Sequence, residues 1–410
     1  MAKWNWRYAL SSSPSLPERF RLPLRRIRRR WQAPHAGCRV LVGQQGGSRD
    51  AGPMSQGGVM TRREMMKGTG SALAFMSMTG VPAAAAGQTA PKLKLMGGEG
   101  PGFGFRNRAG GFDIVEHCHH LGVGVARVSV PQGGADAVRA LRQKLDKYEM
   151  RPIVSVAPPR TDEAVAQYDA NIRAAVELGA VTTHASFTGR RYEEFKTFEA
   201  FKDGFEAHKR SVERAEPILR RHKMRLAIEN HKGWRAAEHA AWVRAIGSEF
   251  IGVCYDFGNN ISLCETPEET FRHLAPLTFY VSFKDMAVEG YDEGFLLSEV
   301  ALGDGMLDIQ GMVRQLQARD PHMVFALEMI TREPLRIPVF TEQYWITFDD
   351  AYSPLPGRDV ARTLEMVRKN VPKKGLTRTA GLTPQQGLAL EDDLINRSIE
   401  YARKNLNLVG

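Results

Sequence analysis

Three acidic residues stand where they could do chemistry, because each comes at the end of an apolar segment. Glu229 follows LAI, Asp256 follows IGVCY and Glu328 follows VFAL. Segments this apolar predict buried strands, and a buried carboxylate is costly unless it is paired, hydrogen-bonded or bound to a cation. Carboxylates that meet raise one another's pKa or hold a cation between them. Their oxygens suit a hard or borderline divalent ion, Mg²⁺ or Mn²⁺ before Zn²⁺.

A lysine and a histidine belong to the same pattern. Lys284 ends the segment TFYVSFK, where it either supplies positive charge to the site or pairs with Asp285 beside it. His231 alternates with Glu229 onto one face of an extended segment, so it is either a substrate-binding residue or a polar loop residue.

Two more residues are candidates for substrate binding. His184 lies in the segment VTTHASF and is expected to face the interior of the fold, where the alternative is a hydrogen-bonded core histidine. Asn259 is the last residue of the stretch DFGN, which follows a strand. The alternative to substrate binding is that Asn259 only stabilises the turn.

The elements that must position these residues repeat eight times from residue 92 onward, each unit being a short apolar run followed by a helical pattern. Strands that alternate with helices pair in parallel, because each needs a long crossover before the next. Eight units in about 280 residues match a closed (β/α)₈ TIM barrel of the α/β class, with an open doubly wound sheet as the alternative. The apolar runs are 93–97, 125–130, 152–157, 181–187, 225–230, 251–257, 278–285 and 323–329.

The connecting segments are helical by their patterns. Residues 136–148 and 163–179 are amphipathic, and Thr266 is predicted to cap a helix that begins at the following proline. After the barrel, which we place at 92–370, residues 371–410 form a linker and a C-terminal helix over 388–406. Since barrels of this kind build their active sites at the carboxyl ends of the strands, the three carboxylates are expected at one rim.

Five stretches in order resemble the xylose-isomerase-like TIM barrel family, which includes sugar isomerases, sugar 3-epimerases and endonuclease IV. They are LAIENH (226–231), CYDFGN (254–259), YVSFKD (280–285), LGDGMLDI (302–309) and FALEM (325–329). The resemblance covers roughly residues 92–370. It implies that Glu229, Asp256 and Glu328 bind a divalent metal ion, and that Glu229 and Glu328 also form an acid/base pair, with Lys284 beside them.

One position departs from the family pattern. The resemblance implies a metal-binding histidine on the seventh strand, and this chain has Ser282 there, with Lys284 and Asp285 retained. A serine hydroxyl is a poor metal ligand. Either the metal is held by three carboxylates, water and a borrowed imidazole such as His231, or the Lys284 ammonium supplies the positive charge instead.

The leader predicts export. Residues 60–86 contain a twin arginine, a moderately apolar middle and a small-residue stretch ending in three alanines, the layout of a cleaved secretory signal. The arginine pair resembles the twin-arginine export motif, so we expect cleavage near Gly87 and a periplasmic or extracellular protein that uses this export machinery. A membrane anchor is the alternative, but the middle is too short to span a bilayer. Residues 1–59 are expected to be a disordered basic leader, or to lie before the true start at Met60.

The charge distribution argues against nucleic acid as a partner. The net charge is +10, yet residues 1–59 alone contribute +9, with eleven Lys or Arg and two acids. A near-neutral barrel does not favour an endonuclease IV-like activity.

The leading hypothesis is therefore an exported, metal-assisted isomerase, epimerase or related lyase that acts on a sugar or cyclic polyol by proton transfer next to a carbonyl. A non-catalytic carbohydrate-binding barrel is the alternative, and a homo-oligomer is compatible with either.

Overall fold

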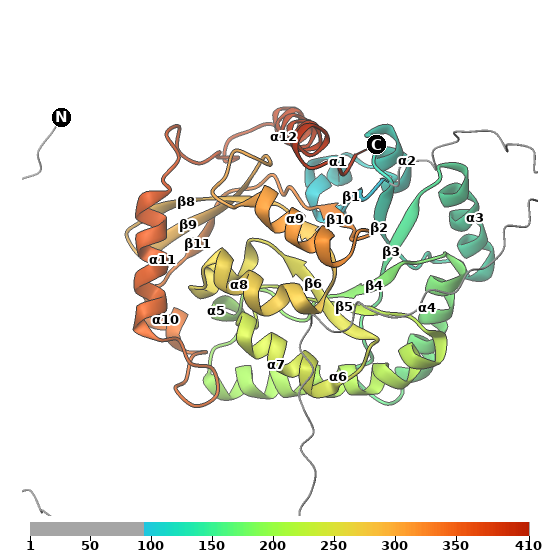
Figure 1. The fold of residues 1–410 in the computed structure, drawn as a ribbon, viewed down its shortest axis with the longest axis horizontal. Coiled ribbons are helices and arrows are strands. Elements are labelled where there is room, and N and C mark those ends of the chain that lie inside the picture. The colour runs from blue at the N-terminus through green and yellow to red at the C-terminus, as the bar shows by residue number, and fades with distance from the viewer. Residues whose placement is uncertain (1–93, 410) are drawn as a thin grey trace, which may run out of the picture. The chain divides into compact units, whose positions relative to one another are not determined.

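The computed structural model describes residues 94–409, and the predicted leader segments 1–59 and 60–86 lie outside them. Eight parallel strands close into a barrel in the order β1-β10-β7-β6-β5-β4-β3-β2 (Figure 1). The predicted (β/α)₈ barrel is confirmed, and each predicted apolar run overlaps one barrel strand. The strands are β1 (Met96–Gly98), β2 (Val125–Ser129), β3 (Arg151–Ser155), β4 (Thr182–Ala185), β5 (Leu226–Glu229), β6 (Ile251–Asp256), β7 (Thr278–Phe283) and β10 (Phe325–Leu327).

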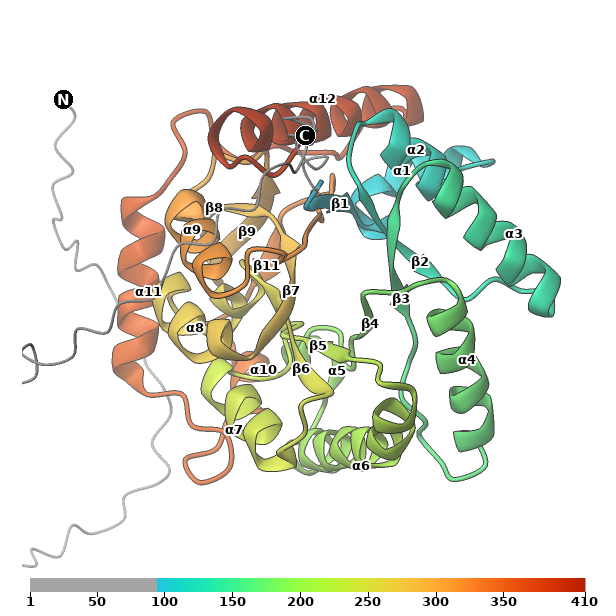
Figure 2. The same ribbon diagram turned by 45° about the vertical axis from the view of Figure 1, so that its right-hand side comes forward.

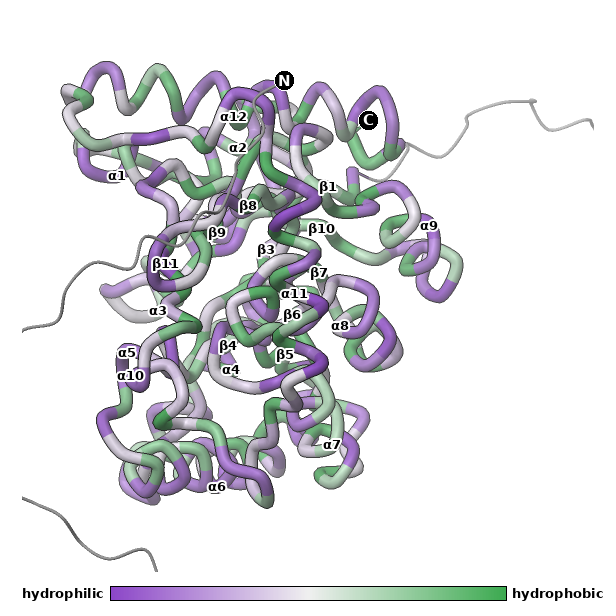
Figure 3. The backbone as a smooth tube through the Cα atoms, turned by 90° about the vertical axis from the view of Figure 1, so that its left-hand side faces the viewer, coloured by the Kyte–Doolittle hydropathy of each residue, from purple (hydrophilic) through white to green (hydrophobic). Residues whose placement is uncertain are grey.

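Helices surround the barrel because each crossover buries one apolar face against the strands (Figure 2). Their hydrophobic and hydrophilic residues alternate along the chain (Figure 3). The α-helices are α1 (Gly104–Ala109), α2 (Ile114–His120), α3 (Gly134–Lys147), α4 (Val165–Glu177), α5 (Arg191–Glu194), α6 (Phe198–His222), α7 (Ala236–Ile246), α8 (Pro267–Leu274), α9 (Ile309–Arg319), α10 (Glu342–Trp345), α11 (Gly357–Lys369) and α12 (Pro384–Asn405). Short 3₁₀ helices are η1 (Gly100–Phe103), η2 (Asn259–Leu263) and η3 (Ala275–Leu277). No helix in the described part of the chain is long and apolar enough to cross a membrane.

The cap predicted for α8 is confirmed, since the Thr266 side chain accepts a hydrogen bond from the backbone N–H of Glu269. The C-terminal helix is also confirmed, although it begins at Pro384, where Thr383 and Gln386 form a capping box. It packs on the barrel: Ser398 accepts a hydrogen bond from the Leu302 N–H. The chain after α12 returns to β1, where the carbonyl of Leu408 accepts hydrogen bonds from two N–H groups at the start of that strand.

A second sheet was not predicted. The strands β8 (Asp285–Tyr291), β9 (Gly294–Val300) and β11 (Leu335–Ile337) form an antiparallel sheet between α11 and the barrel (Figure 1). The run predicted as one strand over 278–285 is therefore divided, with β7 ending at Phe283 and β8 beginning at Asp285. The period-two pattern continues across this break, so the pattern alone could not reveal it.

The barrel has two layers of core. Most buried apolar side chains lie between strands and helices, and a small separate cluster contains one side chain from each of six barrel strands together with Val324. These residues alternate along their strands with the outward-facing ones, so they fill the interior. The interior cluster is Val125, Ile153, Ala227, Cys254, Tyr280, Val324 and Ala326.

Candidate functional site

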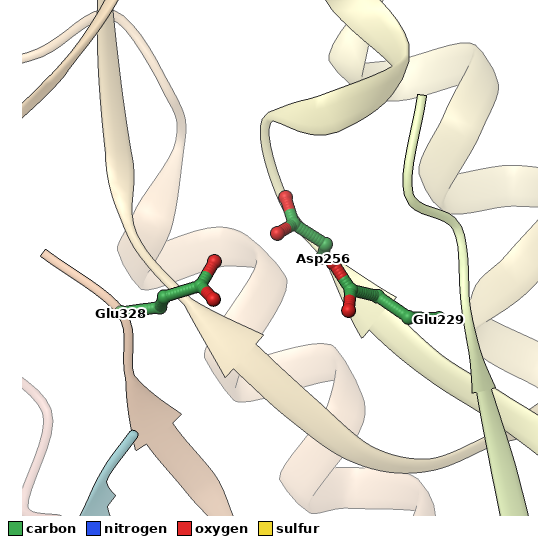
Figure 4. Close-up of side chains that lie close together, drawn as sticks. All are labelled: Glu229, Asp256 and Glu328. Atoms are coloured by element: carbon green, nitrogen blue, oxygen red, sulfur yellow. The ribbon is translucent and has the colours of Figure 1, made fainter. Parts of the chain in front are cut away.

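The predicted carboxylates come together directly above the interior cluster. Glu229, Asp256 and Glu328 lie two residues beyond Ala227, Cys254 and Ala326 respectively, so strand alternation points them into the barrel at its carboxyl end. All three are buried, and their nearest oxygen atoms lie within 4.8 Å of one another (Figure 4).

Lys284 lies among these acids. Its Nζ is 2.7 Å from Oδ2 of Asp256 and 2.5 Å from Oε2 of Glu328. Burial alone would lower the pKa of this lysine, but the two carboxylates outweigh it and raise the pKa well above its usual range. Lys284 is therefore a buried ammonium ion, which bridges strands β6 and β10.

Asp285 turns away from the lysine, although the sequence allowed them to pair. Its carboxylate accepts hydrogen bonds from four backbone N–H groups, its own neighbour Met286 and three residues of the LGDGMLDI stretch. A Cβ on Gly305 would lie 2.2 Å from the Asp285 carboxylate, which explains the glycine there. Asp285 thus holds the loop at 303–307. Among the ion pairs of the described residues there is no Lys284–Asp285 pair, so this alternative from the sequence is wrong.

The two glutamates that face each other across the site differ in proton affinity. Burial, followed by the charges of Glu328 and Asp256, raises the pKa of Glu229 to about 8. Burial would also raise the pKa of Glu328, but Lys284 and Arg127 outweigh it and hold this pKa well below its usual range. Two carboxyl groups whose environments drive their pKa values apart are typical of acid/base sites.

His184 is buried beside Glu229. Its Nδ1 lies 2.7 Å from the Tyr280 hydroxyl, and its Nε2 lies 2.8 Å from Nη1 of Arg127 and 3.4 Å from Oε2 of Glu229. Burial and the Arg127 charge lower the pKa of His184 well below its usual range, so the ring is neutral. A neutral ring that accepts from Arg127 places Nδ1–H toward the tyrosine oxygen.

Asn259 joins two members of the site. Its side-chain N–H₂ donates to Oε1 of Glu229 at 3.1 Å, its backbone N–H donates to Oδ1 of Asp256 at 2.9 Å, and its Oδ1 accepts from Lys232. His231 lies at the edge, where its Nδ1 donates to the backbone carbonyl of Thr188. Burial lowers the pKa of His231 to about 3, so it is neutral.

Sequence reasoning missed three charged residues of the site. Glu99 follows β1 and Arg127 lies in β2, and their charged groups are 3.0 Å apart, with Arg127 also 3.6 Å from Glu328. Lys232 follows β5. A charged residue inside the apolar run VARVSV and an acid after the first strand were the available signals for Arg127 and Glu99.

The carboxylate triad fits a divalent ion by its oxygen chemistry and its spacing. Lys284 competes for the same position, because its nitrogen already contacts two of the three carboxylates. Ser282, which stands where the family resemblance implies histidine, donates a 3.4 Å hydrogen bond to Glu99 and reaches none of the three acids. Metal binding by this chain therefore requires Lys284 to move, and the identity of the ion stays a prediction.

A sizeable cavity lies elsewhere. It has a volume of about 790 Å³ and lies between α6 and α7, lined by residues such as Phe205, Trp234 and Tyr352. None of the triad lines it, so the chemistry of the charged groups, not cavity size, identifies the site.

The chain is a (β/α)₈ barrel in which buried acids and a buried lysine meet at the carboxyl ends of the strands. This is where barrels of this class have their active sites. A family model described as xylose isomerase-like TIM barrel matches residues 107–369, so the chain belongs to that family. The resemblance seen in the sequence is confirmed.

A curated relative matches a shorter stretch. The 3-oxo-isoapionate decarboxylase of Pectobacterium atrosepticum is 28% identical over 107 residues, which are 25% of this chain and 38% of the relative. The chain thus matches less than half the length of that protein.

Solved structures match this chain at low identity. A xylose isomerase domain protein from Planctomyces limnophilus is 15% identical, with 68% of this chain and 96% of that chain covered and a TM-score of 0.45. A xylose isomerase-like TIM barrel protein from Mycobacterium smegmatis, solved in complex with magnesium, is 12% identical, with 67% and 96% covered and a TM-score of 0.44.

Proposed function

We propose that this protein is an isomerase, epimerase or related lyase that acts on a sugar or cyclic polyol by moving a proton next to a carbonyl group. The observation that carries the proposal is the contrast between Glu229 and Glu328. The buried carboxyl group of Glu229, at the end of β5, can gain and lose a proton near neutral pH. The carboxyl group of Glu328, after β10, stays ionised.

Each charged group has a distinct part in this reaction. Glu229 takes the proton from the carbon next to the carbonyl, because its raised pKa makes it the stronger base. Glu328, predicted as its acid/base partner, is a weaker base while Lys284 and Arg127 hold it, and its charge keeps Lys284 in place. A divalent ion held by Glu229, Asp256 and Glu328 would polarise the carbonyl oxygen.

The same machinery serves a lyase. Loss of carbon dioxide from a 3-keto acid leaves an enolate that needs a proton, and Glu229 in its protonated form can give one. The partial similarity to 3-oxo-isoapionate decarboxylase supports keeping this reaction within the proposal. Both reactions share an enolate or enediolate, so the experiment must report on the carbon-bound proton.

The test is proton exchange in D₂O. Purified protein is incubated with a panel of ketoses, ketoinositols and 3-keto sugar acids, and nuclear magnetic resonance follows the hydrogen next to the carbonyl. We expect exchange or product with one compound class, lost on Glu229→Gln. Binding of these compounds without any exchange or product would contradict the proposal and leave a carbohydrate-binding barrel.

The rate should depend on pH through Glu229. A general base acts when it is deprotonated, and the pKa of Glu229 is raised to about 8. We therefore expect kcat/KM to rise with pH toward the range around 8, as Glu229 loses its proton. A pH–rate profile with the exchanging substrate checks this, and a rate that is flat from pH 6 to 9 would exclude Glu229 as the titrating base.

Export remains part of the proposal, on the sequence of residues 60–86. We expect the double change Arg62→Lys with Arg63→Lys to leave the protein in the cytoplasm, because the export machinery reads the arginine pair. Fractionation of cells with an antibody against the barrel measures it, and Lys94→Arg is the control. Normal export of the twin-lysine variant would rule out this route.

A further inference from the structure

Lys232 is a buried lysine at the same barrel end, three residues beyond Glu229. Lys232 is only 3% exposed to solvent. Its backbone φ is +32°, a value that residues other than glycine rarely adopt. A strained backbone at a buried charged residue persists only where surrounding contacts enforce it, and such residues cluster at functional sites.

The charge of Lys232 is not matched by an acid. Within residues 94–409, its Nζ has no carboxylate at ion-pair distance, and the hydrogen bond found for it goes to the neutral Oδ1 of Asn259. The other two buried cations described in the site are both paired: Arg127 with Glu99 and Glu328, and Lys284 with Asp256 and Glu328. Lys232 therefore has donor capacity left for a ligand, because an ammonium carries three N–H groups.

Asn259 ties this lysine to the proposed base. One side-chain amide accepts from Lys232 and donates to Oε1 of Glu229 at 3.1 Å. The two groups are thereby held at a fixed separation, on opposite ends of one planar amide. Proton abstraction needs both a base and a nearby hydrogen-bond donor, because the electrons of the broken C–H bond end on the carbonyl oxygen.

We propose that Lys232 is a catalytic residue that binds the negative oxygen formed when Glu229 removes the proton. This rests on the proposed function. In the step, the C–H bond breaks, its proton goes to Glu229, the carbon–carbon double bond forms and the carbonyl electron pair becomes a lone pair on oxygen. The ammonium of Lys232 donates a hydrogen bond to that oxygen. Lys284 cannot serve as well, since its nitrogen is already held by two carboxylates.

The test uses threonohydroxamate, a four-carbon polyol hydroxamate whose planar CO–N–O group resembles an enediolate. Its binding is measured by isothermal titration calorimetry in EDTA, so that no metal ion contributes. We expect Lys232→Met to weaken binding by roughly 10- to 100-fold, the usual effect of losing a hydrogen bond from a charged group. The exposed Lys373→Met should bind as the unaltered protein does.

A second variant keeps Lys232 but gives its ammonium a carboxylate partner, so that it is no longer free to bind the hydroxamate. Asn259→Asp places a carboxylate where Lys232 now finds a neutral oxygen, so binding should fall although the ammonium remains. Thermal unfolding confirms that each variant is folded. Equal affinity in the unaltered protein and Lys232→Met, or no binding of the hydroxamate at millimolar concentration by the unaltered protein, would overturn the assignment.

The two proposals fail separately. If the hydroxamate depends on Lys232 but no keto sugar exchanges its proton, the oxyanion site stands and the proposed reaction is wrong. If exchange occurs and depends on Glu229, yet Lys232→Met binds the hydroxamate normally, the reaction stands and Lys232 has no part in it.

Discussion

Glu229→Gln is expected to reduce turnover by roughly 10²- to 10⁴-fold, the usual contribution of a positioned general acid or base. The amide keeps the size of the side chain and can still accept from the Asn259 side chain. It cannot take a proton from carbon. Exchange of the substrate's carbon-bound hydrogen with D₂O should fall in parallel with turnover, because both pass through the same abstraction.

The fold should survive this change better than the reaction does. Glu229 is held by a neutral amide and faces a neutral imidazole, so removing its charge leaves no cation unpaired. Thermal unfolding of the variant is the check, and the exposed Glu293→Gln is the matched control for rate and stability. A variant that keeps more than about a tenth of the rate would place proton abstraction on another residue.

The triad could be predicted because strand alternation is a strict rule. Residues at every second position of a strand share a face, so an acid that follows Ala227 or Ala326 by two must enter the barrel. The same rule places Ser282 and Lys284 on one face of their strand, and the structure shows that the interior Tyr280 shares this face. Five motifs in chain order, four at barrel strands and one in the loop at 302–309, then indicated the family, which the family model confirms over residues 107–369.

The partners of these acids could not be predicted from the same rule. Lys232 follows the end of β5, where side-chain direction depends on individual backbone angles. The choice of Lys284 between Asp285 and the triad depends on the loop at 303–307, which supplies N–H groups to Asp285 and so releases the lysine. The hairpin of β8 and β9 was hidden because its first strand continues the pattern of β7.

Charge pairing balances two of the buried acids without the imidazole that the family resemblance implies. With Lys284 between Asp256 and Glu328, two buried negative charges have a cation without any metal. Ser282 instead donates to Glu99, which follows β1, two strands away from β7 in the barrel, and pairs with Arg127. The protein's own cations thus pair with these acids, and a divalent ion would have to displace Lys284 from Asp256 and Glu328.

Lys284→Met should therefore destabilise the protein by about 3–5 kcal/mol, the usual cost of leaving a buried charge without its partner. Asp256 and Glu328 would then lie close together without a cation, beside Glu229. Mn²⁺ should restore much of the loss, because an ion that binds only the folded state stabilises it in proportion to the logarithm of its concentration. Urea unfolding with and without Mn²⁺ measures both effects, and the unaltered protein should gain little from the ion.

Adding Ser282→His to Lys284→Met sharpens the experiment. The imidazole would enter from β7 on the same strand face and supply the fourth ligand that the family resemblance implies, so the double variant should bind Mn²⁺ more tightly than Lys284→Met alone. The single change Ser282→His should raise metal affinity less, because Lys284 still holds two of the carboxylates. If Mn²⁺ stabilises the unaltered protein as much as it stabilises Lys284→Met, the lysine does not occupy the ion's position, and the triad is a metal site of the ordinary family kind.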